Sequence, residues 1–204
     1  EVAVDGPLGA PELGCDRGDR VVPGTKAPCQ VGGFGRLGSW FGCQNYGFEP
    51  DLITVAKGLT SGYLPLGAVI ASPRVAEPFW SGSEAPMFRH GYTYAGHPAA
   101  CAAALANLAI IEREGLVQRV AELAPQFRQI IEEAFAGCPI AGPVRGAGLL
   151  AAVPVRADLL AHDPALPLKI AACARGHGRV VRGLSGVIQL SPPFVITVEQ
   201  IAEG

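Results

Sequence analysis

The sequence predicts a globular protein that mixes β-strands with α-helices, and three observations support this fold class. Of its 204 residues, 49% are hydrophobic and 17% are charged, values that disordered chains do not reach. Two short apolar runs, 51–56 and 67–71, have turn residues around them and are typical of buried strands. Further on, an Ala-rich run over 99–114 and an amphipathic run over 116–135 have helical periodicity.

The sequence also predicts the boundaries of the later elements. Pro98 opens the Ala-rich helix and Gly115 ends it, and because this helix is apolar almost all round we expect it to be buried. The amphipathic helix ends at Gly137. Thr197, followed by Gln200, resembles a capping box that opens a last helix. Between them we expect strands at 149–155, 179–182 and 187–190 and a helix at 168–175.

The first part of the chain differs in composition from the rest. Residues 1–32 are dense in Gly, Pro, Asp and Arg and have neither helical nor alternating periodicity. We therefore predict an irregular segment over 1–32, part of a large domain over 33–137, and a small, truncated C-terminal domain over 138–204.

Charge and hydropathy exclude two classes of partner. Sixteen Lys and Arg against 18 Asp and Glu give a net charge of -2, so we expect no nucleic-acid binding. The longest apolar run, 99–111, is interrupted by Asn107 and is too short to span a membrane. The first residues lack the pattern of a secretory signal, which predicts a cytoplasmic protein.

Cysteine and histidine spacing predicts no metal site. The six cysteines include no C-x-x-C pair, so free thiols are a better interpretation than zinc ligands or disulfides. His90 and His97 are seven residues apart and have no neighbouring acids or cysteines.

A glycine-rich stretch at 33–38, Gly-Phe-Gly-Arg-Leu-Gly, matches the pattern G-x-G-x-x-G. A dinucleotide site also needs a strand directly before it, a helix directly after it and an acid about 20 residues later. No strand pattern precedes the stretch, and Glu49 and Asp51 come too early. We therefore do not expect a nicotinamide or flavin site.

Lys57 follows the first apolar strand and precedes small turn residues. A lysine beside a core, where water is scarce, can be a nucleophile because its ammonium form is disfavoured. The alternative is a lysine whose stem packs on apolar groups and whose amine reaches solvent. Local sequence does not decide between the two.

The loop over 89–98, Arg-His-Gly-Tyr-Thr-Tyr-Ala-Gly-His-Pro, combines hydroxyl groups with small residues just before a predicted helix. Hydroxyls and backbone N–H groups at a helix N-terminus can hold a phosphate. A polar loop with an ordinary helix cap remains the alternative.

Several stretches together resemble the class III pyridoxal-phosphate aminotransferases, the omega-amino-acid transaminase group. The resemblance covers residues 33–204. It is carried by EPDLITVAKG at 49–58, YLPLGA at 63–68 and GYTYAGHP at 91–98, and in the same order by GFGRLGSWF at 33–41, VRGAGL at 144–149 and LSPPFVIT at 190–197.

The resemblance implies an α/β fold of type I among pyridoxal-phosphate-dependent transferases. Such a fold has a large domain around a mostly parallel sheet and a small C-terminal α+β domain. It implies that Lys57 forms the internal aldimine with pyridoxal phosphate and then moves a proton between the substrate α-carbon and the cofactor. Thr93 matches the residue that binds the cofactor phosphate of the neighbouring subunit, which implies a homodimer. Arg182 matches an arginine that pairs with a substrate carboxylate in some members; a surface arginine is the alternative.

One departure from the family concerns the aspartate that pairs with the pyridine nitrogen. Counting back from Gly33, Pro28 occupies the position of that aspartate, and Cys29 and Gln30 follow it. The N-terminal half of a full-length enzyme is also absent. We therefore expect a fragment whose first residues are read out of frame or joined wrongly.

Two hypotheses for function follow. The first is an enzyme that transfers an amino group from an amine or omega-amino acid to a keto acid such as pyruvate, with an intramolecular aminomutase as a variant. The second is a catalytically impaired fragment that binds pyridoxal phosphate weakly or only associates with an intact transaminase.

Overall fold

The computed structural model describes residues 33–203, which divide into two compact units. The N-terminal unit comprises residues 33–35 and 39–117, and the C-terminal unit comprises residues 36–38 and 118–203. The division falls between 117 and 118, whereas the predicted domain boundary lies between 137 and 138, inside the C-terminal unit. The predictions for residues 1–32, including Pro28, lie outside the described residues.

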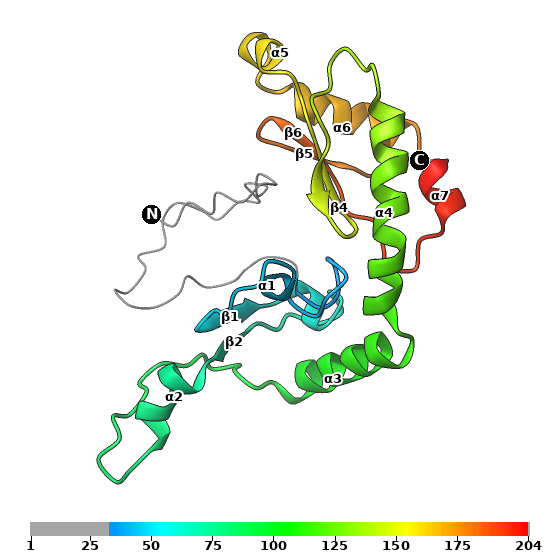
Figure 1. The fold of residues 1–204 in the computed structure, drawn as a ribbon. Coiled ribbons are helices and arrows are strands. Elements are labelled where there is room, and N and C mark those ends of the chain that lie inside the picture. Colours follow the sequence, from blue (N-terminus) through cyan, green and yellow to red (C-terminus); the bar gives the residue numbers. More distant parts are fainter. Residues whose placement is uncertain (1–32, 204) are drawn as a thin grey trace. The chain divides into compact units, whose positions relative to one another are not determined.

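The N-terminal unit has a two-stranded antiparallel sheet whose strands pair Leu52 with Ala71 and Val55 with Ala68. Its apolar core contains Phe34, Val55 and Ile111. Its elements are α1 (Gly42–Asn45), β1 (Leu52–Val55), the 3₁₀ turn η1 (Lys57–Leu59), β2 (Ala68–Ala71), α2 (Pro73–Trp80) and α3 (Pro98–Arg113), of which Figure 1 labels the helices and strands.

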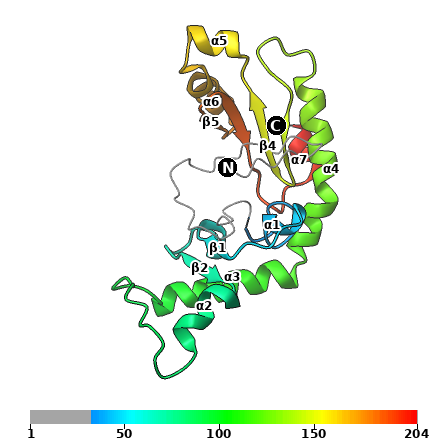
Figure 2. The same ribbon diagram turned by 60° about the vertical axis from the view of Figure 1, so that its left-hand side comes forward.

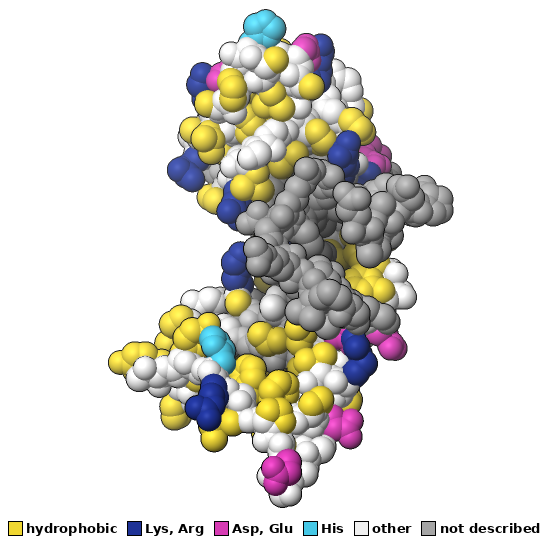
Figure 3. All heavy atoms as spheres, turned by 90° about the vertical axis from the view of Figure 1, so that its left-hand side faces the viewer, with side chains coloured by type: hydrophobic (Ala, Val, Ile, Leu, Met, Phe, Trp, Pro, Cys, Tyr) yellow, Lys and Arg dark blue, Asp and Glu magenta, His cyan; other side chains and the backbone are white. Residues whose placement is uncertain are grey.

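Two burial predictions for this unit are wrong. All four residues of β2 are exposed, because among the described residues this strand pairs with β1 alone and a two-stranded sheet leaves its outer surfaces open. Helix α3 was expected to be buried all round, but Leu105 is 69% exposed. Only one side of α3, with Ala100, Ala104 and Ile111, is buried. The face drawn in Figure 3 shows many such hydrophobic side chains at the surface.

A buried acid ties β1 to the start of α2. Asp51 is 8% exposed, and its carboxylate accepts hydrogen bonds from Ser72 Oγ (3.2 Å) and Arg74 Nε (3.1 Å). The backbone N–H of Ser72 also donates to the carbonyl of Asp51 (2.8 Å). These bonds hold the β1–β2 pair at the end opposite to Lys57.

The C-terminal unit contains a four-stranded sheet in the order β3-β4-β6-β5, with every neighbouring pair antiparallel. Helices α4 and α6 pack against this sheet (Figures 1 and 2). The elements are α4 (Leu116–Phe135), β3 (Arg145–Ala147), β4 (Leu150–Pro154), α5 (Ala157–His162), α6 (Leu166–Gly176), β5 (Arg182–Leu184), β6 (Val187–Leu190) and α7 (Val198–Ala202). Strand pairs within residues 33–203 are all antiparallel, so the parallel strands implied by the resemblance are not in this part.

The core of the C-terminal unit is built by α4, β4 and β6. Helix α4 contributes Val120, Leu123 and Phe127, which recur at helical spacing, and the sheet contributes Val153 and Ile188. This arrangement confirms the amphipathic pattern predicted over 116–135. All five side chains are below 9% exposed, so their burial is a main source of stability of this unit.

The predicted boundaries in the C-terminal unit are mostly confirmed. The capping box exists: Thr197 N donates to Gln200 Oε1 (3.0 Å), and Gln200 N donates to Thr197 Oγ1 (3.2 Å). The strand expected at 179–182 instead runs from Arg182 to Leu184, because Val187 pairs with Leu184 and the sheet register follows from that pair. Val180 lies before the strand and is 86% exposed.

Cysteines in the described part of the chain are free thiols, as predicted. Cys43 is buried, Cys101 and Cys138 are half-buried, and Cys173 is exposed. Cys15 and Cys29 lie outside the described residues. None of the helices within residues 33–203 is long and apolar enough to cross a membrane.

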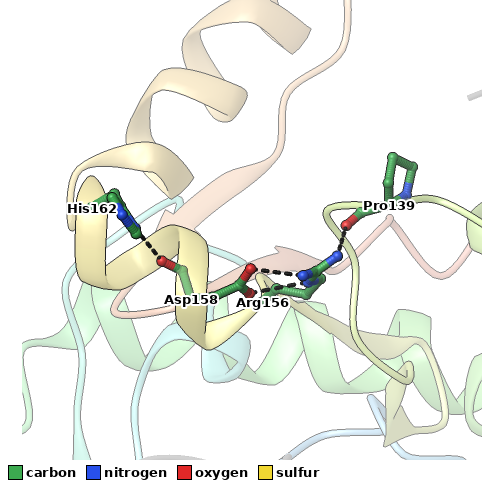
Figure 4. Close-up of polar contacts among 4 residues, drawn as sticks. All are labelled: Pro139, Arg156, Asp158 and His162. Carbon is green, nitrogen blue, oxygen red and sulfur yellow. Dashed lines mark hydrogen bonds and ion pairs between the residues drawn. The ribbon is translucent and has the colours of Figure 1, made fainter.

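Two ion pairs lie at the two ends of α5. Arg156 makes paired hydrogen bonds with Asp158, at 3.0 Å and 2.7 Å, and donates to the carbonyl of Pro139 at 2.9 Å (Figure 4). Lys169 Nζ lies 2.6 Å from Asp163 Oδ2. The hydrogen bonds from Arg156 and Lys169 lower the pKa of Asp158 and of Asp163, respectively.

Acidification is therefore expected to destabilise the C-terminal unit. A carboxylate whose pKa is lower in the folded state stabilises that state above the unfolded pKa, and this stabilisation is lost as the pH falls through the folded pKa. The urea midpoint should consequently fall as the pH drops below about 4, the ordinary pKa of an aspartate in the unfolded chain, toward the lower pKa of the folded state. The double variant Asp158→Asn, Asp163→Asn should have a smaller pH dependence than the native chain, and an unchanged one would contradict the assignment.

Candidate active site

Lys57 lies at the start of η1, two residues after the end of β1. The turn is closed locally by a hydrogen bond from Leu59 N to the carbonyl of Ala56 (2.6 Å). Lys57 is exposed, and within residues 33–203 its amine has no hydrogen bond and no ion pair. The sequence places Lys57 correctly at the end of a strand. The expected shortage of water around it is not found, because Lys57 is exposed; this exposure matches the alternative of a lysine that reaches solvent.

Asn107 of α3 holds the turn from the other side. Its Nδ2 donates to the carbonyls of Gly58 (2.9 Å) and Leu59 (3.1 Å), and its Oδ1 accepts from Ser61 Oγ (2.6 Å). These bonds join residues 46 to 49 positions apart in the sequence. In the sequence, Asn107 was notable only because it interrupts an apolar run. A single amide side chain in an Ala-rich helix is the signal that could have indicated this contact.

Two further contacts restrain the same turn. Thr60 is 2% exposed, and its Oγ1 donates to the carbonyl of Leu64 (2.6 Å). A Cβ on Gly58 would lie 3.3 Å from the ring of Phe34, so the core residue Phe34 packs directly beneath the turn. The backbone that carries Lys57 is therefore fixed although the side chain is exposed.

Thr93 lies in the loop that precedes α3, as predicted. Two backbone hydrogen bonds, from Ala95 N to Tyr92 O (2.9 Å) and from His97 N to Tyr94 O (3.2 Å), fold this loop into consecutive turns. Thr93 is exposed, and within residues 33–203 no hydrogen bond involves its hydroxyl or connects it to Lys57.

The start of α3 has the features expected from its sequence. Pro98 is at the first helical position, and His97 Nδ1 accepts a hydrogen bond from Ala100 N (3.4 Å). This histidine is therefore a helix cap. Within residues 33–203 no three potential metal ligands come together.

Arg182 is the first residue of β5, where it pairs with Gln189 of β6, and it is exposed. It belongs to the C-terminal unit, whereas Lys57 and Thr93 belong to the N-terminal unit. The assignment of Arg182 to a substrate carboxylate stays a prediction.

The glycine-rich stretch at 33–38 has a packing role. The next helix along the chain, α1, begins at Gly42 and has four residues, so no helix opens directly after the motif. Arg36 Nη1 donates to the carbonyls of Leu149 (3.3 Å) and Pro192, and its guanidinium lies 4.6 Å from the centre of the Phe194 ring. Burial lowers the pKa of Arg36.

Comparison with known proteins places these features in context. The model of the family "Aminotransferase class-III" matches residues 30–204. Gamma aminobutyrate transaminase 3, chloroplastic, of Solanum lycopersicum is 40% identical over 177 residues, which cover 84% of this chain and 34% of that protein. The diaminobutyrate–2-oxoglutarate transaminase of Halomonas elongata is 44% identical over 181 residues, which cover 85% of this chain and 39% of the relative.

A solved structure of a transaminase is also similar to this chain. The amine transaminase of an uncultivated Pseudomonas species, in its PLP-bound form, is 40% identical to this chain and superposes with a TM-score of 0.75. The match covers 83% of this chain and 39% of that one. The chain thus spans between 34% and 39% of the length of these three proteins.

Proposed function

Because the chain belongs to the class-III aminotransferase family, we propose that it moves an amino group from an amine or omega-amino acid to a keto acid such as pyruvate, using pyridoxal phosphate held on Lys57. Its fold is the α/β fold type I of the pyridoxal-phosphate-dependent transaminases. The observation that carries the proposal is the Lys57 amine: it has no partner within residues 33–203 and stands on a turn fixed by α3.

The donor groups of the N-terminal unit fit a phosphorylated aldehyde. Lys57 supplies a primary amine that is not committed to an ion pair among the described residues, and such an amine can bond to a carbonyl carbon. Thr93 supplies an exposed hydroxyl, a group suited to a phosphate oxygen. When bound, pyridoxal phosphate withdraws electrons from the substrate carbon that carries the amino group.

In this proposal Lys57 has two roles and Thr93 has one. Lys57 Nζ would hold the cofactor and would accept the proton that leaves the substrate carbon bearing the amino group. The exposure of the side chain leaves Nζ free to reach both positions. Thr93 would serve the cofactor phosphate of a second copy of the chain, which is why we propose a homodimer.

The charge of Arg182 and the names of two relatives indicate which class of amino donor the chain would bind. The exposed guanidinium of Arg182 can pair with a carboxylate through two parallel hydrogen bonds. γ-Aminobutyrate and diaminobutyrate, which the names of the two relatives contain, combine a terminal amine with a carboxylate. We therefore propose an amino acid with a distal amine as the donor.

A catalytically impaired chain, which binds pyridoxal phosphate weakly or only associates with an intact transaminase, is the second candidate. Pro28, outside the described residues, stands where the resemblance places an aspartate against the pyridine nitrogen. Losing that charge-assisted hydrogen bond would cost roughly 1.5 to 3 kcal/mol, which is about one to two decades in rate.

An amine-transfer assay separates the candidates. The purified chain with pyridoxal phosphate should convert pyruvate to alanine when γ-aminobutyrate or diaminobutyrate is present, with equal loss of donor, and reactions without keto acid serve as the control. Cofactor binding without alanine formation would support the impaired chain. If the chain neither binds pyridoxal phosphate at millimolar concentration nor forms alanine, both the catalytic proposal and the weak-binding proposal are contradicted.

A further inference from the structure

We propose that Asn107 is a positioning residue for Lys57: it fixes the backbone of the Lys57 turn and thereby sets where the amine can reach. The inference rests on the proposed function of Lys57. No part of it requires a contact between the two units, because Asn107 and the turn both belong to the N-terminal unit.

The chemistry of the contacts fixes the orientation of the Asn107 amide. The carbonyls of Gly58 and Leu59 can only accept, so the Asn107 NH₂ must face them, at 2.9 Å and 3.1 Å. The remaining oxygen then faces Ser61 and accepts its hydroxyl at 2.6 Å. The three hydrogen bonds can form together only in this orientation of the Asn107 amide.

The turn needs this support from outside. Ser61 has a φ of 50°, in the left-handed region that costs a residue other than glycine roughly 1 kcal/mol or more. Within the turn itself, the bonds from Leu59 N to Ala56 O and from Tyr63 N to Thr60 O connect only near neighbours. Asn107 adds the connection to α3, a helix of 16 residues.

A fixed backbone matters because the Lys57 side chain is exposed. A lysine side chain has about 2 kcal/mol of rotamer entropy, and its reach is set by the position of its Cα. A displacement of the reacting group by about 1 Å can cost roughly a hundredfold in rate. By holding the carbonyls of the two residues that follow Lys57, Asn107 limits such a displacement.

Three variants test the inference on the full 204-residue chain. Asn107→Leu removes every bond, Asn107→Asp keeps the acceptor for Ser61 but sets a carboxylate against two carbonyls, and Ser61→Ala removes one bond and leaves α3 intact. Arg113→Ala, at the exposed end of the same helix, is the matched control. Each variant is titrated with pyridoxal phosphate, and borohydride fixation at Lys57 is measured by peptide mass spectrometry.

We expect the dissociation constant for pyridoxal phosphate to rise about fivefold in Ser61→Ala, which loses one bond, since a lost bond is worth about 1 kcal/mol. The rise should be larger in Asn107→Leu, which loses all three bonds, and larger still in Asn107→Asp. The control should match the native chain. Amide hydrogen exchange at Leu59 and Tyr63 should accelerate in the Asn107 variants while exchange in α4 stays the same. A purely structural role would change the unfolding midpoint and leave the cofactor affinity of the folded fraction unchanged.

The outcomes separate this inference from the proposed function. If the native chain binds the cofactor and the Asn107 and Ser61 variants bind equally well, the inference is overturned and the function stands. If the native chain does not bind the cofactor, the proposed function fails, and hydrogen exchange still decides whether Asn107 holds the turn: unchanged exchange at Leu59 overturns the inference here as well. Should Asn107→Leu fail to fold, Ser61→Ala provides the same comparison.

Discussion

Replacing Lys57 by alanine or arginine is expected to abolish covalent retention of pyridoxal phosphate after borohydride treatment. Neither side chain offers a primary amine, and arginine keeps only the positive charge. Amine transfer should fall by at least roughly 10² to 10⁴-fold, because the same residue is proposed to move the substrate proton. Both effects are read from one sample, by mass spectrometry of the Lys57 peptide and by alanine formation.

The lysine content of the chain makes this experiment decisive. The sequence contains three lysines, Lys26, Lys57 and Lys169. Lys169→Arg is the matched control, because Lys169 is engaged with Asp163 at 2.6 Å, and it should retain the native labelling. A label that persists in Lys57→Ala on Lys26 or Lys169, at the native stoichiometry, would contradict the assignment of Lys57.

Replacing Gly148 by alanine is expected to lower the free energy of unfolding of the C-terminal unit by a large amount. Gly148 has a φ of 57°, and a Cβ there would lie 2.4 Å from both the carbonyl oxygen of Arg36 and the Cα of Leu37. These are backbone atoms that cannot turn away, and Leu149 N donates to Arg36 O beside them (3.0 Å). The left-handed conformation and the overpacking together should cost about 3 to 4 kcal/mol in free energy of unfolding.

Gly137→Ala separates the two causes. Gly137 also has a positive φ, 73°, but nothing lies within 4 Å of a Cβ built there. Its replacement should therefore cost only about 1 kcal/mol. The difference between the two variants, measured by urea unfolding followed by circular dichroism, is the cost of the clash between residues 148 and 36–37. Equal losses would show that the close approach does not contribute.

Much of the local structure was predictable because it depends on neighbours in the sequence. Pro98 and the residues after it specify where α3 begins, and Thr197 with Gln200 specify the cap of α7. Lys57 is placed at a strand end by the apolar run before it and the glycine after it. Each of these features involves groups within a few positions of each other, where propensity and capping act.

Burial in the N-terminal unit was not predictable in the same way. Leu105 and β2 are apolar, and composition alone predicts that they are covered. Exposure depends on which surfaces meet them, and the described residues bring only β1 beside β2. The same reason explains the Lys57 amine, which was expected to be short of water and is exposed.

The sequence by itself determined the family, the positions of Lys57, Thr93 and Arg182 along the chain, and most helix and strand boundaries, because short motifs and local capping carry that information. Only the tertiary structure decided that Asn107 clamps the Lys57 turn and that residues 36–37 press against Gly148. Those contacts join positions 46 to 112 apart, and such pairs form only when packing of the whole unit offsets the entropy of closing a long loop.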